Sequence, residues 1–372
     1  MPESNAARIV DDLFFEQEVE VLATNYKHGV LRSVAVLGRS LLFSRAASAG
    51  ETSIASGSSV AVVFFPNEFE AMRAAPAGMP RVDRILRLDL HALSIVRRTL
   101  GLRGLAAQSA RFLRMALRAK GSGCIGRLTY PLLGWLLYQT FRALLVDKAG
   151  VHMVTTNMQH PLSIGVAWAA VDSGQAADFY EHATTPRLVF NNRGYGAYFV
   201  QFEHTGRMLV EQGVDPARVH VLQPIAIAAA GVADPIRAVG VCVNILDSLE
   251  SIADVSAVLR EKGLGVTYRV HDADPRLAQL RLLAMREKAG LSNARESRIQ
   301  AFLETVDLVI VGNSNVIADA LVAGRRVVYF WAGAESMLDY YGLVSHYGVP
   351  SAHDRESLRS AIDSLQPAAA AG

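Results

Sequence analysis

The stretch Asp307–Trp331, "DLVIVGNSNVIADALVAGRRVVYFW", has the pattern of a strand, a helix and a second strand. An apolar run predicts a buried strand, helically spaced apolar residues predict a helix, and Gly324 predicts the end of that helix. The polar residues Asn313, Ser314 and Asn315 stand where the first strand passes into the helix. A helix start carries unpaired N–H groups and a partial positive charge. These residues therefore either cap the helix or help to seat a phosphate.

Similar units extend outward from this stretch in both directions. The runs "AVGVCVNIL" and "GVTYRVH" precede it as predicted strands, each followed by a helical pattern. Strands that alternate with helices form parallel sheets covered on both faces. In the first half, "SVAVLG", "SSVAVVFFP", "GVHMVTTN" and "RLVFNN" predict strands, whereas "YFVQFEHTGRMLVEQG" predicts a helix.

A linker separates these two halves. The segment "IAIAAAGVADPIR" has a linker composition and places the domain boundary after residue 228. We therefore expect an α/β protein with two Rossmann-like domains, residues 1–228 and 229–372, that face each other across a cleft. An arginine-rich helical region, from about Leu90 to Asp147, is expected within the first domain.

The composition excludes several classes of protein. A hydrophobic fraction of 51% and a charged fraction of 19% exclude a mainly disordered chain. The two cysteines have neither metal-site spacing nor a disulfide framework, which fits a reducing cytoplasm. The N-terminus has early acidic residues and no secretory pattern. The apolar run Pro131–Val146 is too short and too polar to span a bilayer.

Charge is distributed unevenly along the chain. Between Met72 and Lys148 there are fourteen Lys or Arg and three acidic residues, a balance of 14 − 3 = +11, against a net +2 overall. This region could lie on an anionic membrane surface, with Trp135 inserting at the interface, or could hold an acidic acceptor. Ordinary solvated helix faces are the alternative. Nucleic acid is not expected, because no recognition motif accompanies the charge.

Two polar groups are expected at one edge of the second domain's sheet. His271 and Asp272 follow the strand "GVTYRV", as Asn313, Ser314 and Asn315 follow "DLVIVG". Ligands of open α/β sheets bind at the carboxyl ends of the strands, so these residues are candidates for phosphate binding. Alanine at Asn313 or Ser314 is expected to weaken this binding with little effect on folding. The chain has no GxGxxG after a strand, no P-loop, no HExxH and no GxSxG motif.

The segments "GLGVTYRVHDADPR" and "RIQAFLETVDLVIVGNSNVIADALVAGRRVVYF" resemble the nucleotide-binding domain of GT-B-fold glycosyltransferases. The group resembled builds bacterial surface polysaccharides, such as capsules, and includes sialyltransferases and polysialyltransferases. Its strand ends in R-x-H-P, and a paired-hydroxyl turn precedes a helix of the form D-A-L-x-x-G. The resemblance implies that His271 and the turn hold the donor's phosphate and nucleotide. This chain departs from the pattern at Asp272, which would repel a phosphate, and at Asn315.

The first domain offers candidates for proton transfer. Glu181 and His182 lie just after a predicted strand, and His160 follows another. In polysaccharide transferases of this kind the corresponding face supplies the base that activates the acceptor hydroxyl. Either a carboxylate or an imidazole can accept a proton in a suitable environment. The alternative is that these side chains are structural. The cluster Glu203–Thr205 is expected on an exposed helix face.

These patterns lead to the hypothesis of a cytoplasmic glycosyltransferase, metal-independent and with the inner membrane face as a second location. Its second domain would bind a CMP-, UDP- or GDP-linked sugar as substrate, with no separate cofactor, and its first domain a glycan or lipid-linked acceptor. One rival is a nucleotide-sugar epimerase on the same fold. Another is a non-catalytic partner protein that has lost donor binding, which the departures at Asp272 and Asn315 favour.

Overall fold

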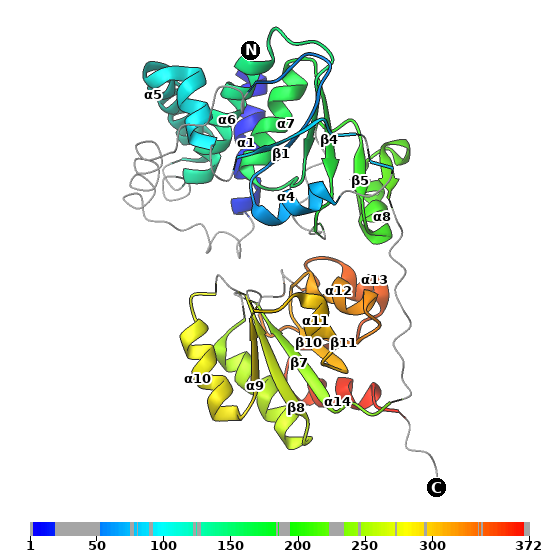
Figure 1. Cartoon of the computed structure of the whole chain (residues 1–372). Coiled ribbons are helices and arrows are strands. Elements are labelled where there is room, and N and C mark those ends of the chain that lie inside the picture. Colours follow the sequence, from blue (N-terminus) through cyan, green and yellow to red (C-terminus); the bar gives the residue numbers. More distant parts are fainter. Residues whose placement is uncertain are drawn as a thin grey trace. The chain divides into compact units, whose positions relative to one another are not determined.

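The computed structural model describes residues 3–18, 53–74, 78–79, 81–88, 92–121, 124, 128–183, 185, 194–222, 234–244, 247–271, 274–293, 296–333, 335 and 338–367. The chain divides into two compact units, Met1–Pro224 and Ile225–Gly372, each with its own parallel sheet (Figure 1). The expected α/β class is therefore confirmed. The boundary expected after residue 228 lies within residues 223–233, outside the described part of the chain.

The N-terminal sheet has the strand order β2-β1-β3-β4-β5-β6, with every described pair parallel. The register places Val62 beside Thr155 and Val154 beside Asp178, so the carboxyl ends of these strands meet at one edge. The strands are β1 (Ser59–Val63), β2 (Arg84–Arg87), β3 (His152–Thr155), β4 (Ala176–Tyr180), β5 (Tyr198–Val200) and β6 (Val219–Val221).

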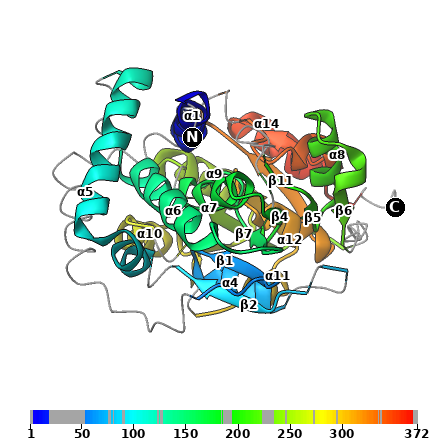
Figure 2. The ribbon, with the colours of Figure 1, turned by 90° about the horizontal axis from the view of Figure 1, so that it is seen from above.

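Helices cover both faces of this sheet, because strand residues alternate between two cores. Val60 and Val62 belong to the larger core, with α1 (Glu3–Glu18), α5 (Ala92–Lys120), α6 (Thr129–Leu145) and α7 (Pro161–Asp172). Ala61 and Val63 pack on the other face with α4 (Pro66–Arg73). Helix α8 (Glu203–Glu211) packs against β5 and β6. Figures 1 and 2 both place α6 beside α7 and α5 outside α6.

Two glycines allow α6 and α7 to approach closely. A Cβ atom on Gly165 would lie 2.1 Å from the carbonyl oxygen of Gly134, and one on Gly134 would lie 2.4 Å from that of Pro161. Any side chain at either position would push the helices apart. This contact sets α6 firmly on α7, so that α6 in turn supports α5.

The C-terminal sheet has the order β12-β11-β10-β7-β8-β9, and its described pairs are also parallel. Its strands are β7 (Ala238–Val243), β8 (Gly265–Val270), β9 (Gly290–Asn293), β10 (Leu308–Val311), β11 (Arg326–Phe330) and β12 (Ser351–Ala352). Its helices are α9 (Leu249–Glu261), α10 (Leu277–Glu287), α11 (Ile299–Leu303), α12 (Val316–Val322), α13 (Leu343–Tyr347) and α14 (Arg355–Ser364). The opening strand–helix–strand prediction is confirmed as β10, α12 and β11.

Some sequence expectations need correction. The helix predicted over residues 198–213 begins only at Glu203, because Tyr198–Val200 forms β5 between β4 and β6. Strands β2 and β9 were not expected. Both are short edge strands, and "RILR" and "GLSN" lack the continuous apolar run of a central strand. The predicted strands "SVAVLG" and "RLVFNN" lie outside the described residues.

Candidate functional site

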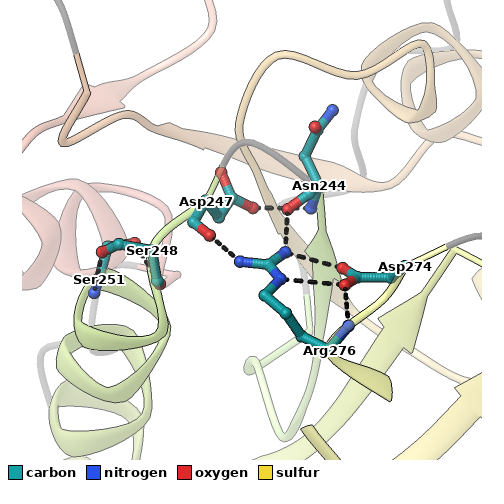
Figure 3. Close-up of polar contacts among 6 residues, drawn as sticks. All are labelled: Asn244, Asp247, Ser248, Ser251, Asp274 and Arg276. Carbon is teal, nitrogen blue, oxygen red and sulfur yellow. Dashed lines mark hydrogen bonds and ion pairs between the residues drawn. The ribbon is translucent and has the colours of Figure 1, made fainter. Parts of the chain in front are cut away.

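A buried ion pair joins two loops that follow strands of the C-terminal sheet (Figure 3). The carboxylate of Asp274, after β8, accepts hydrogen bonds from Nε and Nη2 of Arg276 at 2.9 and 2.7 Å. The same guanidinium donates to the backbone carbonyls of Asn244, at 2.9 Å, and Asp247, both in the loop after β7. The Asp274 side chain has no exposed surface, and that of Arg276 is 19% exposed. Arg276 therefore fixes the β7 and β8 loops.

Beside this ion pair, Asp247 lines a small cavity. Its Oδ2 accepts a hydrogen bond from the Asn244 backbone N–H at 2.7 Å. The cavity of about 20 Å³ is also lined by Cys242, Ser251 and Gly312 and has room for one water molecule. Burial raises the pKa of the Asp247 carboxyl to about 6, although the Asn244 hydrogen bond opposes the shift. The edge of the sheet thus carries a carboxyl group whose pKa is raised to about 6.

Asn313 fixes the turn after β10. Its Oδ1 accepts hydrogen bonds from the Tyr329 hydroxyl and the Tyr340 backbone N–H, both at 3.0 Å. Its backbone carbonyl accepts one from Asn244 Nδ2 at 2.5 Å, which joins the β10 turn to the β7 loop. The residue is buried. The predicted position at the carboxyl edge of the sheet is confirmed, but the side-chain oxygen accepts two hydrogen bonds within the fold, so it is not open to a nucleotide.

Ser314 and Asn315 are more open to a ligand. Ser314 Oγ accepts a 3.3 Å hydrogen bond from Val316 N–H, a long cap of α12, and the residue is half-buried. Asn315 Oδ1 is buried and has no partner among the described residues, although the residue as a whole is half-buried. His271 directly follows β8, as expected, and is exposed. Asp272 lies outside the described residues.

Different outcomes are expected for alanine at the two adjacent turn residues. Ser314→Ala should weaken binding of the best-binding nucleotide about 2- to 10-fold, the effect of one hydrogen bond, with little change in unfolding. Asn313→Ala should lower the free energy of unfolding by about 1–3 kcal/mol or more, because Tyr329 and Tyr340 lose a buried acceptor. Calorimetric titration and urea unfolding of both variants measure the contrast. Equal stability of the two variants would contradict a structural Asn313.

Asp319 is a candidate that the sequence reasoning missed. It lies one turn inside α12 and accepts no hydrogen bond from the described residues, and burial raises the pKa of its carboxyl. Burial raises the pKa of the Cys242 thiol to about 12; Arg269 opposes this, and the nearby charges of Asp319 and Asp247 add to it. Asp319 is thus close to the same edge. Asp319 is the acidic residue of the D-A-L-x-x-G helix pattern, so the sequence did contain a signal for it.

Both carboxylate oxygens of Glu181, at the carboxyl edge of the N-terminal sheet, accept hydrogen bonds from the protein. Its Oε1 accepts hydrogen bonds from Thr185 N–H at 3.1 Å and the Thr205 hydroxyl at 2.7 Å. Its Oε2 accepts two more, from the N–H groups of Gln201 at 2.7 Å and Phe202 at 3.3 Å. The side chain is fully buried. Because protein donors use both oxygens, we assign Glu181 a positioning role at the loops after β4 and β5.

His182, which follows Glu181 in the chain, has one ring nitrogen in a hydrogen bond and one without a partner among the described residues. Its Nδ1 lies 2.6 Å from the carbonyl oxygen of Thr156, which can only accept, so Nδ1 carries the proton of that bond. The half-buried ring therefore presents Nε2, which has no hydrogen bond to the described residues. A neutral imidazole oriented in this way can accept a proton through Nε2.

Glu68, in α4, is a second residue that the sequence reasoning missed. Its Oε2 accepts hydrogen bonds from the backbone N–H groups of Phe64, at 2.6 Å, and Phe65, at 3.2 Å. Its Oε1 and Thr156 Oγ1 are buried and accept no hydrogen bond from the described backbone, and the two side chains interact with each other. Burial raises the pKa of the carboxyl, while those hydrogen bonds and nearby His182 oppose the shift. The buried Glu68 and Thr156 oxygens and the nearby His182 ring together make this edge polar enough to bind a hydroxyl or a water.

The remaining predicted residues serve the fold. His160 is buried and caps α7, with Nδ1 accepting from Leu162 N–H at 3.4 Å. Phe65 and Tyr130 contact its ring edge-on, and burial lowers its pKa to about 4. It therefore stays neutral at physiological pH. The expectation of an exposed face at residues 203–205 holds only for Glu203, since His204 and Thr205 are buried.

Comparison with known proteins identifies the fold. No protein-family model and no curated protein matches this chain. The S. aureus MnaA–UDP structure matches with a TM-score of 0.51 and 10% identity, over 83% of this chain and 87% of that one. A Listeria monocytogenes protein described as a UDP-N-acetylglucosamine 2-epimerase matches with 0.50 and 12% identity, over 84% and 88% of the two chains. The apo lipopolysaccharide outer core galactosyltransferase WaaB gives 0.40 and 10%, over 83% and 95%.

The assignment of the fold rests on the first two of these structures. The chain has a two-domain α/β fold of the GT-B type. The GT-B part of the sequence-based resemblance is therefore confirmed. The finer resemblance to sialyltransferases stays a prediction, because neither of these two structures is described as one.

Proposed function

We propose that this protein is an enzyme that acts on a nucleotide-sugar and that its C-terminal domain binds the nucleotide. The observation that carries the proposal is the composition of the carboxyl edge of the C-terminal sheet. There Arg276 holds the loops, Asn315 Oδ1 has no partner among the described residues, and the Asp319 carboxyl accepts no hydrogen bond from them. Ligands of open α/β sheets bind at this edge, and a carboxylate there suits the hydroxyls of a ribose. The fold shared with a structure that contains UDP supports this assignment.

We further propose that the enzyme transfers the sugar to a hydroxyl of a glycan or lipid-linked acceptor, in surface-polysaccharide synthesis. The donor would be a UDP-, GDP- or CMP-linked sugar. His182 would accept the proton of the acceptor hydroxyl through Nε2, while Glu68 and Thr156 would bind near the reacting groups. Such a reaction depends on positioning, on proton removal and on stabilisation of the departing phosphate. This scheme assigns no step to a metal ion.

A nucleotide-sugar epimerase is the second candidate. The specific observation in its favour is the match to a structure described as a UDP-N-acetylglucosamine 2-epimerase, at the TM-score of 0.50. An epimerase needs no acceptor. The same residues would then move a proton on the sugar itself, with His182 again the group best placed to exchange one.

One series of measurements separates the candidates. The full chain is titrated calorimetrically with UDP, GDP and CMP, and the corresponding nucleotide-sugars are then incubated with and without a panel of octyl glycosides. Nucleotide release that requires an octyl glycoside supports the transferase. A changed sugar without any acceptor supports the epimerase. Absence of binding by every nucleotide would reject both candidates and leave the non-catalytic partner protein.

Nucleotide-sugar binding should depend on pH through Asp247. Its folded-state pKa of about 6 lies above the usual value of 3.8 for an aspartate, so the carboxyl is neutral below about pH 6 and anionic above. An anionic carboxylate repels a diphosphate, so affinity should fall as pH rises through about 6. Asp247→Asn should bind with high affinity on both sides of this range. Calorimetric titration with UDP-N-acetylglucosamine at a series of pH values tests this; an identical pH profile in wild type and variant would contradict it.

A further inference from the structure

Helix α5 concentrates positive charge on the outside of the N-terminal domain. Its sequence, "ALSIVRRTLGLRGLAAQSARFLRMALRAK", has seven basic residues and no acidic one. A kink at Gly101, where φ is +65°, divides the helix into a short first part, residues 92–100, and a long second part, residues 102–120. One side of that second part is buried, through Leu105, Phe112 and Ala116. The helix is therefore anchored in the domain while its other side faces outward.

Two stripes share the outward side of α5. Residues that differ by 3, 4, 7, 8, 11 or 15 positions lie on the same face of a helix. Leucines and alanines form the first stripe, with Leu102 66%, Leu113 40% and Leu117 37% exposed. Arginines form the second stripe beside it, at exposed positions Arg103, Arg111, Arg114 and Arg118.

The arginine stripe is not neutralised within the described residues. No ion pair joins Arg103, Arg114 or Arg118 to a described acidic residue, although Lys120 at the helix end pairs with Asp11 at 3.1 Å. Arg111 lies over the Trp135 ring, with its guanidinium carbon 5.8 Å from the ring centroid. The sequence-based expectation that Trp135 inserts into a membrane is wrong, because its side chain is fully buried in the core. Within the basic region, the exposed leucines of α5 are therefore the candidates for apolar insertion.

We propose that the outer side of α5 is a docking surface for an anionic lipid bilayer, on which the helix lies parallel to the membrane plane. Exposed leucines beside arginines match the boundary between acyl chains and anionic headgroups. An acidic protein or a nucleic acid would satisfy the arginines and leave the leucine stripe unused. No helix in the described part of the chain is long and apolar enough to cross a bilayer. This proposal does not depend on the reaction proposed above.

Vesicle co-sedimentation of the full chain tests the arginine stripe. We expect binding to vesicles of equal parts phosphatidylglycerol and phosphatidylcholine, much weaker binding to phosphatidylcholine alone, and loss of binding as salt rises. The triple variant Arg103→Gln, Arg114→Gln and Arg118→Gln should bind about 100-fold less, at roughly fivefold for each arginine. The matched control replaces three exposed arginines outside α5, Arg207, Arg281 and Arg286, with glutamine. An equal loss in both triple variants would overturn the proposal.

A site-specific probe tests the leucine stripe. Both native cysteines are buried, so a cysteine placed at an exposed position can be labelled selectively. An environment-sensitive fluorophore on Leu113→Cys should shift to the blue when anionic vesicles are added. The same label on Val210→Cys, in α8 and 38% exposed, should not shift. No shift at residue 113, or stronger binding to a single-stranded oligonucleotide than to the vesicles, would reject the lipid surface.

Discussion

His182→Gln is expected to lower turnover of the nucleotide-sugar by about 10²–10⁴-fold, the range for loss of a general acid or base. Glutamine can still donate a hydrogen bond to the Thr156 carbonyl, the bond that now orients the ring at 2.6 Å. It cannot accept a proton as an imidazole does. Because the residue acts in the transition state, kcat should fall while the calorimetric affinity for the nucleotide stays unchanged.

His160→Gln is the matched control for this prediction. His160 is also a histidine at the carboxyl edge of the N-terminal sheet, but it caps α7 and burial lowers its pKa to about 4. Its loss should lower the free energy of unfolding and leave kcat of the folded fraction nearly unchanged. A small effect of His182→Gln together with a large effect on kcat of His160→Gln would exchange the two roles and move the base to α7.

Glu68→Gln provides a second, independent test of the same site. The substitution keeps the shape of the side chain and removes the titratable group near His182. If Glu68 sets the charge around His182, the pH profile of kcat should shift in Glu68→Gln while the fold is retained. An unchanged pH profile would confine Glu68 to its hydrogen bonds with Phe64 and Phe65.

Much of the fold is predictable because its central strands are continuous apolar runs. Buried parallel strands such as β7 and β10 need apolar residues on both faces, so they can be recognised without any tertiary information. The stretch Tyr198–Gly213 was misassigned because its helical periodicity begins only at Glu203. The three residues of β5 are too few to show a period of their own. Edge strands β2 and β9 could not be recognised because their sequences lack a continuous apolar run.

The position of the polar residues at the sheet edge was predictable, but the contacts of each side chain were not. The rule for open sheets placed Asn313, Ser314 and Asn315 at the carboxyl edge of the second sheet correctly. Sequence alone does not show that Tyr329 and Tyr340 occupy the Asn313 acceptor, since these contacts join residues far apart in the chain. Glu68 was overlooked because it stands within a helix.

The ion pair behind this edge gives the largest expected effect on stability. Arg276→Met leaves the fully buried Asp274 carboxylate without its partner and should lower the free energy of unfolding by about 3–5 kcal/mol. Arg355→Met, which removes the exposed pair with Asp254 at 2.6 Å, is the matched control and should cost less than about 1 kcal/mol. Urea unfolding of the full chain, followed by far-UV circular dichroism, measures both variants.

The same pair should make stability depend on pH. Burial alone would raise the pKa of Asp274, but the hydrogen bonds and charge of Arg276 outweigh it and hold the pKa below the usual 3.8. A lowered folded-state pKa contributes stability that is present above the unfolded value and is lost as pH falls through the folded value. Without Arg276, burial leaves the Asp274 pKa of the variant above the usual 3.8. The stability difference between wild type and Arg276→Met should therefore shrink as pH falls from this raised value towards the lowered value of the wild type.

The double variant Asp274→Asn with Arg276→Met separates charge from loop contacts. Without a buried carboxylate, it should recover part of the stability lost in Arg276→Met, because an unpaired buried charge costs more than a neutral pair. If the double variant is as unstable as the single one, the loss comes from the guanidinium bonds to the Asn244 and Asp247 carbonyls. Arg276 would then act chiefly as the clamp of the β7 loop, and nucleotide affinity should fall equally in both variants.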